Sequence, residues 1–453
     1  MQLCPIGTLL AVLVEVGMAG QTFHVDATRG RDGRDGLSPE TAWQSLEKVN
    51  AAPLGPGDKV LFRRGETWRG QLVPRSGDAA GPITYAAYGE GPKPLLLGSV
   101  AMDRPEDWRD LGGGIWATAT IRPDVGNLIF DGGKATGFKK WREQDLTQDG
   151  DFVYDRVSWQ VKLRSVASPA TLHKSIELAL CRHIIDQSGK GCITYEGLDL
   201  RYGAAHGIGG GGTHHITVRN CDLSYIGGGH QHTRPDGHPV RYGNGIEFWA
   251  GARDCLVEGC RLWEIYDAAL TNQGSGTNVQ ENITYRRNVI WNCEYSFEYW
   301  NRDESSRTRN LRFEHNTCVD AGHGWGHRQR PDPNGRHLMF YHNSAVTEDF
   351  VVRYNVFANA TESGLWLHGR DWSAALTMDR NCWFQPKGAL MLWGKESFTP
   401  EQFAAYQQKT GKDAGSLVAD PKFVNAAGRD YRLAPDSPAR TLGDEGGPAG
   451  ALP

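Results

Sequence analysis

The sequence predicts a right-handed parallel β-helix, and three observations carry that prediction. A short pattern of alternating apolar residues recurs seven times between Ile193 and Gly394, starting with I-x-Y-x-x-L-x-L at Ile193. Alternation with a period of two places these side chains on one face of a strand. Successive repeats start 23 to 39 residues apart, as from Ile193 to Ile216 and from Ile216 to Cys255. Strands this short bury an apolar face only when they stack, so the repeat indicates a solenoid of coils.

The third observation is a single position that recurs within each repeat. It is occupied, in order, by Leu198, Cys221, Cys260, Asn288, Asn316, Asn355 and Asn381. Stacked Asn side chains can hydrogen-bond from one coil to the next, and Asn tolerates the left-handed backbone that a tight turn demands. We therefore expect an asparagine ladder along one corner of the helix.

Residues 1–20 resemble a secretory signal peptide, which implies a secreted or periplasmic protein. An apolar run extends from Ile6 to Val14 and small residues follow it, although Lys and Arg are missing before the run and Glu15 follows directly after it. The alternative is a first strand that caps the helix. Elsewhere the sequence has no stretch long enough to span a membrane.

Residues 21–190 are expected to contain a helical cap, the first coils and a β-rich excursion, and residues 191–453 the main helix with a closing segment. Ser38-Pro39-Glu40 is a plausible helix start, with Ser as the N-cap and Pro in the first turn. The expected helices span 38–52 and 397–412, and the expected strands outside the repeats span 59–62, 71–74, 83–88, 95–97 and 423–433.

Composition excludes some partners and cofactors. Lys and Arg total 49 against 53 Asp and Glu, so nothing indicates a nucleic-acid partner. Four of the nine cysteines, Cys221, Cys255, Cys260 and Cys318, fall on inward positions, where we expect small core side chains rather than disulfides. No Cys/His spacing typical of zinc occurs, and His230, His232 and His238 lack a fixed ligand spacing. We expect a monomer without a metal.

Several stretches resemble a known group of proteins. GLSPETAWQSLEKVNAA, PGDKVLFRRGETWRGQL, GLDLRYGAAHGIGG and the Asn repeat are similar to the pectate-lyase-like β-helix proteins of bacterial polysaccharide degradation, in particular family 141 of the glycoside hydrolases. The resemblance covers residues 22–433 and implies a carbohydrate-active enzyme. No catalytic motif of the family matches residue by residue, so the resemblance assigns no catalytic residue.

Two outward columns are predicted on the third strand of the coils. The first contains Glu247, Leu270, Glu298 and Gly326, and the second contains Trp249, Asn272, Trp300 and Arg328. Two coils apart, Glu247 and Glu298 should have Cα atoms about 9–10 Å apart. Inverting glycosidases separate their carboxyl groups by roughly 6.5–9.5 Å and retaining ones by about 5–5.5 Å, so this spacing favours inversion. The plain alternative is two solvated glutamates on an outer face.

Tryptophans and insertions accompany these carboxyl groups. Trp249 and Trp300 each follow a glutamate by two residues, which offers a sugar-stacking surface and a lower dielectric that raises an acid's pKa. A further column at the bend before this strand contains Asp267, Tyr295, His323 and Glu362. Insertions at 229–244, 301–309 and 328–337 enter beside this face, and long loops in repeat proteins commonly form the binding face.

These observations support the hypothesis of a secreted glycoside hydrolase that cuts a plant or algal polysaccharide. Glu298 and Glu247 are the expected acid and base, and Asp267 is the substitute for either. The expected substrate-binding residues are Trp249, Trp300 and Trp366 for stacking, and Asn272, His323, Arg328 and His368 for hydrogen bonds.

Two alternatives stay open at this point. A polysaccharide lyase would eliminate at a uronate, using Arg328, His323 or Tyr299, with Arg241 and Arg330 nearby and possible help from calcium. A carbohydrate-binding β-helix without catalysis would use the same face and release no product.

Overall fold

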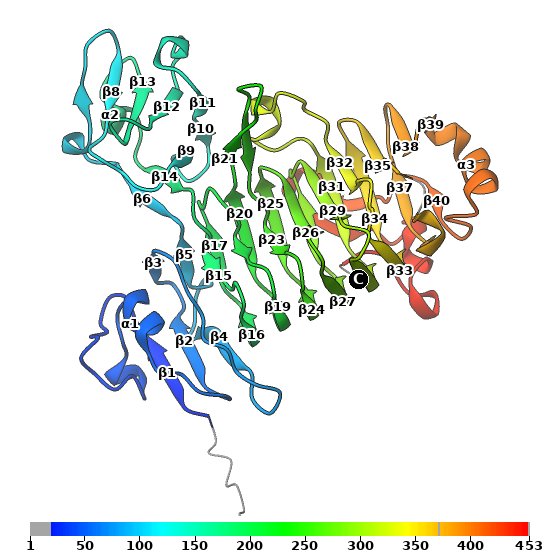
Figure 1. The fold of residues 1–453 in the computed structure, drawn as a ribbon, viewed down its shortest axis with the longest axis horizontal. Helices are drawn as coiled ribbons and strands as arrows, with labels where there is room; N and C mark the ends of the chain where they lie inside the picture. Colours follow the sequence, from blue (N-terminus) through cyan, green and yellow to red (C-terminus); the bar gives the residue numbers. More distant parts are fainter. Residues whose placement is uncertain (1–19, 370–371, 452–453) are drawn as a thin grey trace, which may run out of the picture.

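The computed structural model describes residues 20–369 and 372–451, which wind into a right-handed parallel β-helix (Figure 1). Each regular coil contributes one strand to each of three sheets, and strands of successive coils pair in parallel. The predicted fold class is therefore confirmed. The expected signal peptide lies outside the described residues, except for Gly20. No helix within the described ranges is long and apolar enough to cross a membrane.

The three sheets are numbered in the order in which the chain enters them. Sheet 1 contains β1 (Thr22–Val25), β2 (Lys59–Arg63), β4 (Ile83–Tyr88), β16 (Gly191–Glu196), β19 (His214–Arg219), β24 (Arg253–Glu258), β27 (Val279–Arg286), β30 (Arg307–Glu314), β33 (Val346–Arg353) and β36 (Leu376–Asp379). Sheet 2 contains β3 (Thr67–Arg69), β5 (Leu95–Leu97), β17 (Asp199–Arg201), β20 (Asp222–Ile226), β25 (Arg261–Ile265), β28 (Val289–Trp291), β31 (Thr317–Ala321), β34 (Val356–Ala360), β37 (Cys382–Phe384) and β40 (Leu417–Val418). Sheet 3 contains β15 (Ile185–Asp186), β18 (Ile208–Gly209), β23 (Ile246–Phe248), β26 (Ala268–Gly274), β29 (Tyr295–Asn301), β32 (Arg336–Phe340), β35 (Ser363–Leu367), β38 (Ala389–Trp393) and β39 (Glu396–Phe398).

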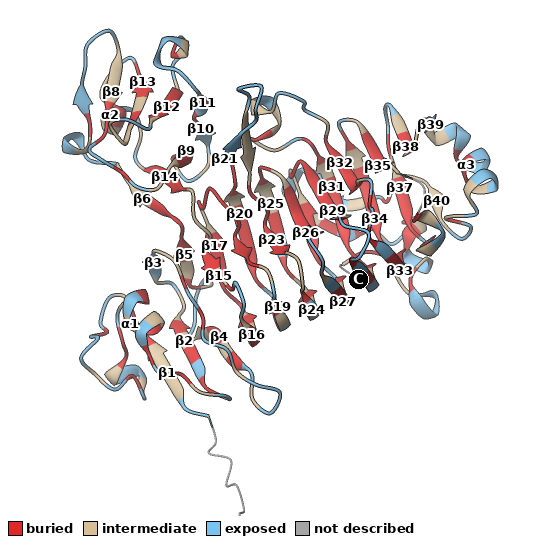
Figure 2. Cartoon of the chain, in the orientation of Figure 1, coloured by how far each residue is buried: buried red, intermediate tan, exposed pale blue. Residues whose placement is uncertain are grey.

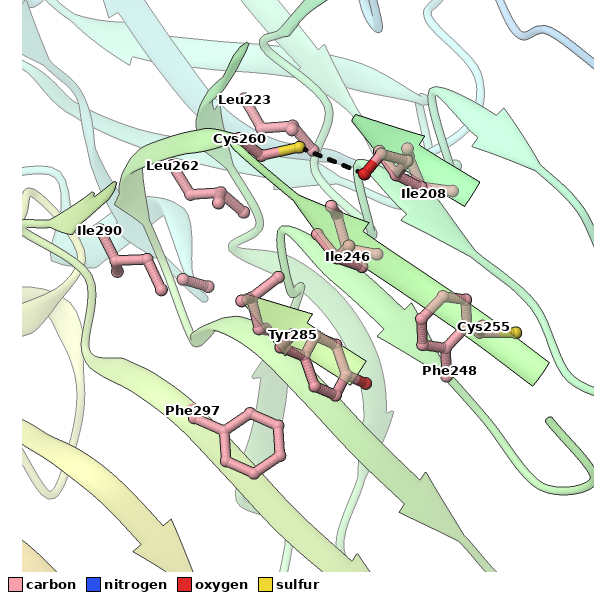
Figure 3. Packing of buried hydrophobic residues seen from close by; sticks show 14 of the residues in the cluster. Ile208, Leu223, Ile246, Phe248, Cys255, Cys260, Leu262, Tyr285, Ile290 and Phe297 are labelled. Carbon is pink, nitrogen blue, oxygen red and sulfur yellow. Dashed lines mark hydrogen bonds between the residues drawn. The ribbon is translucent and has the colours of Figure 1, made fainter. Parts of the chain in front are cut away.

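The interior of the helix is a continuous apolar core built from the repeated positions. Buried residues follow all three sheets in Figure 2, and Figure 3 shows Phe248, Tyr285 and Phe297 lying in the same interior from three different strands. Full burial of one such side chain contributes roughly 1.5–3 kcal/mol. The four inward cysteines are buried and carry free thiols, as predicted.

The asparagine ladder forms at the corner between sheets 1 and 2. Asn316 Oδ1 accepts the backbone N–H of Asn288 at 3.0 Å, and Asn316 Nδ2 donates to the carbonyl of Tyr285 at 3.0 Å. Equivalent bonds recur at the other Asn positions of the ladder. One detail of the prediction is wrong, because the left-handed residue is the one before each Asn, as at His315 with φ 53°. That bend turns the Asn side chain inward.

Short helices close both ends of the core. Leu46 of α1 (Leu46–Ala51) and Tyr406 of α3 (Phe403–Thr410) are part of the same buried cluster as the coils. The predicted helix at 38–52 is split into a 3-10 turn, Pro39–Thr41, and α1, each capped by a serine. The helix predicted at 397–412 starts later, because β39 occupies 396–398. The strand predicted at 71–74 is wrong, and the segment 423–433 is a hairpin of β41 (Phe423–Asn425) and β42 (Asp430–Leu433).

The predicted excursion forms two small sheets beside the helix, and these sheets are mainly antiparallel (Figure 1). One contains β6 (Ser99–Ala101), β9 (Val125–Phe130), β10 (Ala135–Thr136) and β14 (Ile176–Leu180). The other contains β7 (Arg109–Asp110), β8 (Ile115–Ala117), β11 (Phe138–Lys140), β12 (Asp151–Asp155) and β13 (Gln160–Arg164), with the short helix α2 (Pro169–Leu172) following. The first coils and the main helix are continuous across it, since β4 pairs directly with β16.

Candidate functional site

A cavity of about 1370 Å³ lies over sheet 3 and contains the predicted carboxyl groups Glu247, Asp267 and Glu298. Its walls come from three parts of the chain that are far apart in sequence. They are the hairpin of β21 (Gly229–Thr233) and β22 (Pro239–Tyr242), the insertion at 328–332, and β11 of the excursion.

The sheet register places both glutamates in one column. Glu247 pairs with Thr271, and Thr271 pairs with Glu298, so the two glutamates are two strands apart as predicted. Leu270 and Asn272 point into the core instead of outward, which corrects the predicted columns. The bend before β26 contains one more residue than the bend before β29, and a shift of one residue reverses every following side chain.

The position expected for Asn272 is taken by its neighbour. Gln273 lines the cavity between the strands of Trp249 and Trp300, while Asn272 Nδ2 donates to Gln280 Oε1 inside the helix. The predicted column residues Gly326 and Arg328 also lie elsewhere, because β32 occupies that coil's place in sheet 3 and pairs with β29. Arg328 belongs to a 3-10 turn, His327–Gln329, and both Arg328 and Gln329 still line the cavity.

The carboxyl group of Glu247 is buried and held by two donors on one oxygen. His206 Nε2 lies 3.1 Å from Glu247 Oε2, and Asn244 Nδ2 donates to the same oxygen at 3.2 Å. The tautomer of His206 is fixed, because its Nδ1 accepts the backbone N–H of Asn244 at 3.0 Å and Nε2 must carry the hydrogen. Oε1 is therefore the oxygen left to hold a proton. Burial, with a contribution from Asp267, raises the pKa of Glu247 to about 8.

Glu298 and Asp267 form an interacting pair of carboxyl groups. Burial raises the pKa of Glu298 well above its usual value, and the charge of Asp267 adds to this effect. Burial also raises the pKa of Asp267, although the charge of Arg330 opposes it. Gln273 Nε2 donates to Glu298 Oε2 at 2.6 Å, and Arg330 Nη1 lies 3.2 Å from Asp267 Oδ1. The charge of Asp267 thus disfavours ionisation of Glu298, and Arg330 stabilises the ionised form of Asp267.

Arg330 is fixed by its surroundings. Its Nη1 donates to the carbonyl of Tyr266 at 3.0 Å, and its Nε lies 3.7 Å from Glu294 Oε1. The guanidinium also lies over the ring of Tyr295, 5.5 Å from the centroid. Glu294 Oε2 in turn lies 2.9 Å from His327 Nδ1. The insertion that carries Arg330 is thus anchored to sheet 3, and its positive charge stays beside Asp267.

Aromatic side chains edge the cavity beyond the glutamates. Trp249 and Trp300 meet edge to face, with ring centroids 5.3 Å apart and an interplanar angle of 86°. In an edge-to-face pair, the ring whose edge meets the other ring has neither of its own faces covered by that partner. The guanidinium of Arg302 lies over the ring of Trp300 at 4.9 Å.

The other predicted substrate-binding residues lie farther along the helix or on another side. Trp366 shares the glutamates' column, next to Met339, but lies under Arg336, 4.5 Å from its ring centroid, outside the cavity lining. His368 is exposed and contacts the Trp366 ring. His323 is exposed at the end of sheet 2, where its ring meets Asn359, and is not part of this cavity.

The three parts of the cavity wall are joined by contacts that were not predicted from the sequence. Gln329 Nε2 donates to the carbonyl of Gly137, and its Oε1 accepts from Lys139 N and from Arg241 Nη1 at 3.2 and 2.9 Å. One side chain therefore connects the excursion, the hairpin and the insertion. Arg241, weighed for substrate binding, is half-buried and donates instead to the carbonyl groups of Gly126 and Gly228. His206, Asn244 and Gln273 were missed as well, since none falls in the predicted columns.

A second hollow, of about 960 Å³, lies over sheet 2 and also contains acidic, basic and aromatic residues. Its carboxylates are paired, as shown by Asp222 with Arg261 at 2.5 Å and Glu196 with Arg219 at 3.1 Å. Trp263 stacks on the neighbouring tryptophan of the next coil, with centroids 4.8 Å apart and planes within 2°. No ring face and no unpaired carboxylate is left here comparable to those in the cavity over sheet 3, among the residues that the structure describes.

Comparison with known proteins gives partial matches. No family model matches the chain. A stretch of 157 residues, 31% of this chain, is 30% identical to 9% of a lacto-N-biosidase of Bifidobacterium longum subsp. longum. A stretch of 62 residues, 14% of this chain, is 31% identical to 10% of an alpha-1,3-galactosidase A of Akkermansia muciniphila. The chain thus matches about a tenth of the length of each curated relative.

Solved structures share the fold over nearly the whole chain. Pectate lyase Pel9A superposes with a TM-score of 0.52 at 11% identity, covering 96% of this chain and 95% of that one. A structure described as a glycoside hydrolase superposes with a TM-score of 0.51 at 10% identity, covering 92% and 99%. Identities this low show the fold alone. The expected likeness to pectate-lyase-like β-helix proteins is confirmed.

Proposed function

We propose that this chain is a glycoside hydrolase that cleaves a poly- or oligosaccharide in the cavity over sheet 3. The observation that carries the proposal is the group of three carboxyls, Glu247, Asp267 and Glu298, in one cavity edged by two tryptophans. Glycoside hydrolysis uses a protonated carboxyl to protonate the leaving oxygen and an ionised one as base or nucleophile. The surroundings of the three groups supply both forms at neutral pH.

Glu247 is the proposed general acid. With a pKa of about 8 it keeps its proton at neutral pH, and the two donors on Oε2 direct that proton to Oε1. The neutral His206 acts as a positioning residue, because it donates a hydrogen bond to Glu247 without adding a charge. Burial lowers the pKa of His206 well below its usual value, which keeps the ring neutral.

The pair of Asp267 and Glu298 is the proposed base. It holds one negative charge next to Arg330, and that charge can accept a proton from water or attack the anomeric carbon. If the pair attacks the anomeric carbon, the water that later hydrolyses the intermediate gives its proton to Glu247. If the pair activates water directly, the pair takes that proton and Glu247 regains one from solvent. Trp249 and Trp300 would hold a sugar ring by stacking.

Hydrolysis is favoured over elimination by how most of the basic groups are used. Arg330 and Arg241 pair with Asp267 and with backbone carbonyls, and His323 lies outside the cavity lining, which leaves Arg328 as the lyase candidate in the cavity. Both curated relatives are named as glycosidases, which supports the same choice. Secretion follows the expectation for residues 1–20 and belongs to this proposal.

The proposal is tested by incubating the purified protein with a panel of poly- and oligosaccharides. New reducing ends are measured together with the ultraviolet absorbance of an unsaturated uronate. Reducing ends without that absorbance are expected. A rise in both signals, with dependence on calcium, would establish a lyase, and binding without any product would establish a carbohydrate-binding protein.

The general acid is tested with leaving groups of different quality. Glu247→Gln should lose most activity on the natural glycoside but keep it on an aryl glycoside whose leaving group departs without protonation. Asp267→Asn should lose both activities, because the base is needed in either case. In the unaltered enzyme, kcat/KM should fall about tenfold per pH unit above about pH 8, where Glu247 loses its proton.

A further inference from the structure

A cluster of metal-ligating side chains lies on sheet 1, apart from the three carboxyl groups. It consists of Cys192 on β16 and of His214 and His215 on β19. The parallel register pairs Gly191 with His214 and Ile193 with Ile216, so Cys192 lies beside His215 on the neighbouring coil. One ligand atom from each of the three residues lies within 4.8 Å of the other two.

The spacing of the two imidazoles suits a shared metal ion. Nδ1 of His214 and Nδ1 of His215 are 3.2 Å apart. Two nitrogens that each lie about 2.0–2.1 Å from a tetrahedral zinc ion are separated by about 3.3–3.4 Å. The two nitrogens share a hydrogen bond in this structure, at a separation close to the one that such an ion would impose. The thiol of Cys192, which is 6% exposed, faces them from the adjacent strand.

Local backbone features bring the three side chains together. A Cβ at Gly191 would lie 2.2 Å from the ring of His214, so glycine at this position allows the ring to cross β16 next to Cys192. Cys192 itself has φ 56°, in the left-handed region. Later coils bend at the same place with Asp254 and Asn282, residue types that adopt this conformation readily. Cysteine is not such a residue, which indicates that its side chain serves another purpose.

A carboxylate supports the outer histidine. Asp254 Oδ2 lies 3.8 Å from His215 Nε2, and Asn282 Nδ2 donates to Asp254 Oδ1 at 2.8 Å. Histidines that bind a metal through one nitrogen commonly direct the other to a carboxylate, which fixes the ring and makes the ligand more basic. Asp254 lies on the Nε2 side of the His215 ring, at a distance longer than a hydrogen bond, so it acts on the ring through its charge when Nδ1 faces the metal.

We propose that Cys192, His214 and His215 bind a divalent transition-metal ion of zinc type, with water in the fourth position. One thiolate and two imidazoles form a ligand set that suits zinc and its neighbours rather than calcium or magnesium. The ion would join two successive coils just after the turns that contain Ser188 and Gly211, both of which line the cavity over sheet 3. The ion would stabilise that edge of the cavity. This proposed metal site does not depend on the proposed hydrolase activity.

The test uses cobalt as a spectroscopic probe of the full chain, after treatment with a chelator. One equivalent of Co²⁺ should produce the near-ultraviolet charge-transfer band of a thiolate ligand and the intense visible bands of a tetrahedral site, and Zn²⁺ should displace it. Cys192→Ser should abolish the charge-transfer band. His215→Ala should weaken cobalt binding at least tenfold, and Asp254→Asn about tenfold.

Cys181→Ser is the matched control, since Cys181 is another free thiol that is not fully buried, and this variant should keep the band. Zinc should also raise the Tm of the unaltered protein and of Cys181→Ser but not that of Cys192→Ser or His215→Ala. Absence of a thiolate band in the unaltered protein would overturn the proposal. So would an equal band in Cys192→Ser, or cobalt bands that involve nitrogen ligands alone.

Discussion

The two hollows of the helix contain the same residue types but use them in opposite ways. In the hollow over sheet 2, Asp222 is paired with Arg261 and Lys93, and Trp263 is covered by a stacked tryptophan. In the cavity over sheet 3, Glu247 has neutral donors as neighbours, and Glu298 has Gln273 and Asp267. Residue composition therefore does not identify a reactive site. The pairing of the charges does.

The pKa values express this difference. Burial acts on both sets of carboxyl groups, but Arg261 and Lys93 overcome it and hold the pKa of Asp222 below its usual value. Among the residues that the structure describes, no Lys or Arg forms an ion pair with Glu247, and burial raises its pKa to about 8. Asp222, paired with two cations, stabilises the fold as a carboxylate, whereas Glu247 keeps its proton and is available to donate it. Asp267 lies between these cases, because it is buried but paired with Arg330.

The largest expected effect is on catalysis. Glu247→Gln and Asp267→Asn should each lower kcat by about 10²–10⁴, the usual contribution of general acid and base groups. Glu258→Gln is the matched control, because Glu258 lies in the other hollow and pairs with Arg286 at 2.8 Å. Its turnover, measured on the same substrate, should equal that of the unaltered enzyme. Equal losses of turnover in all three variants would show that the carboxyl groups of the two hollows do not differ in their contribution to catalysis.

The second effect is a loss of stability in the paired hollow. Asp222→Asn leaves Arg261 and Lys93 without their carboxylate, and should lower the free energy of unfolding by about 2–4 kcal/mol. Denaturant titration at neutral pH measures this change. Because the folded pKa of Asp222 is lowered, its contribution is present above the unfolded value and disappears as pH falls through the folded pKa. The difference between variant and parent should therefore shrink in acid.

The third effect has the opposite sign. The folded pKa of Glu247 is raised, so its protonated form stabilises the protein fully below the unfolded pKa, and this stabilisation is lost as pH rises toward about 8. The Gln side chain of Glu247→Gln does not ionise, so the variant keeps this stabilisation as pH rises. It also keeps the contacts with His206 and Asn244. At pH 8 the variant should be more stable than the parent by about 2 kcal/mol, less than the full pKa shift because the cavity relaxes. A variant less stable than the parent at pH 8 would contradict the raised pKa.

The smallest expected effect concerns the tryptophans. Trp300→Ala should raise KM about fivefold, consistent with the loss of one stacking contact worth about 1 kcal/mol. Trp291→Ala, in the other hollow, is the control, and it should lower Tm without changing KM, since Arg429 and Trp263 cover its faces. Steady-state kinetics and a melting curve of both variants separate the two roles.

Features that repeat along the chain could be predicted from the sequence. The Asn ladder and the shared column of Glu247 and Glu298 follow from a period that is visible in the residues themselves. Asn272 was placed on the wrong face because one extra residue in a bend changes the register without interrupting the apolar pattern. The pattern records which residues alternate, and it does not fix where a strand begins.

Features that depend on contacts between unrelated segments could not be predicted. His206 reaches Glu247 from the preceding coil, and Gln329 reaches Gly137 across nearly two hundred positions of the chain. Cys192 and His215 are neighbours through the register of two strands, while their sequence spacing matches no zinc motif. These contacts are set by how loops fold onto the helix, which no local period describes.

The bonds of Gln329 also bear on how this molecule could be re-engineered. The excursion enters after β5 and returns at β15, while β4 pairs with β16 as if nothing intervened. The excursion is therefore an insertion in a continuous helix. The Gln329 side chain joins it to residues 328–332 at Gly137 and Lys139, and Glu177 joins it to the coils through Arg69. A graft that keeps the carboxyl groups and exchanges residues 98–180 for another sequence should change the wall that β11 gives the cavity while leaving Glu247, Asp267 and Glu298 in place.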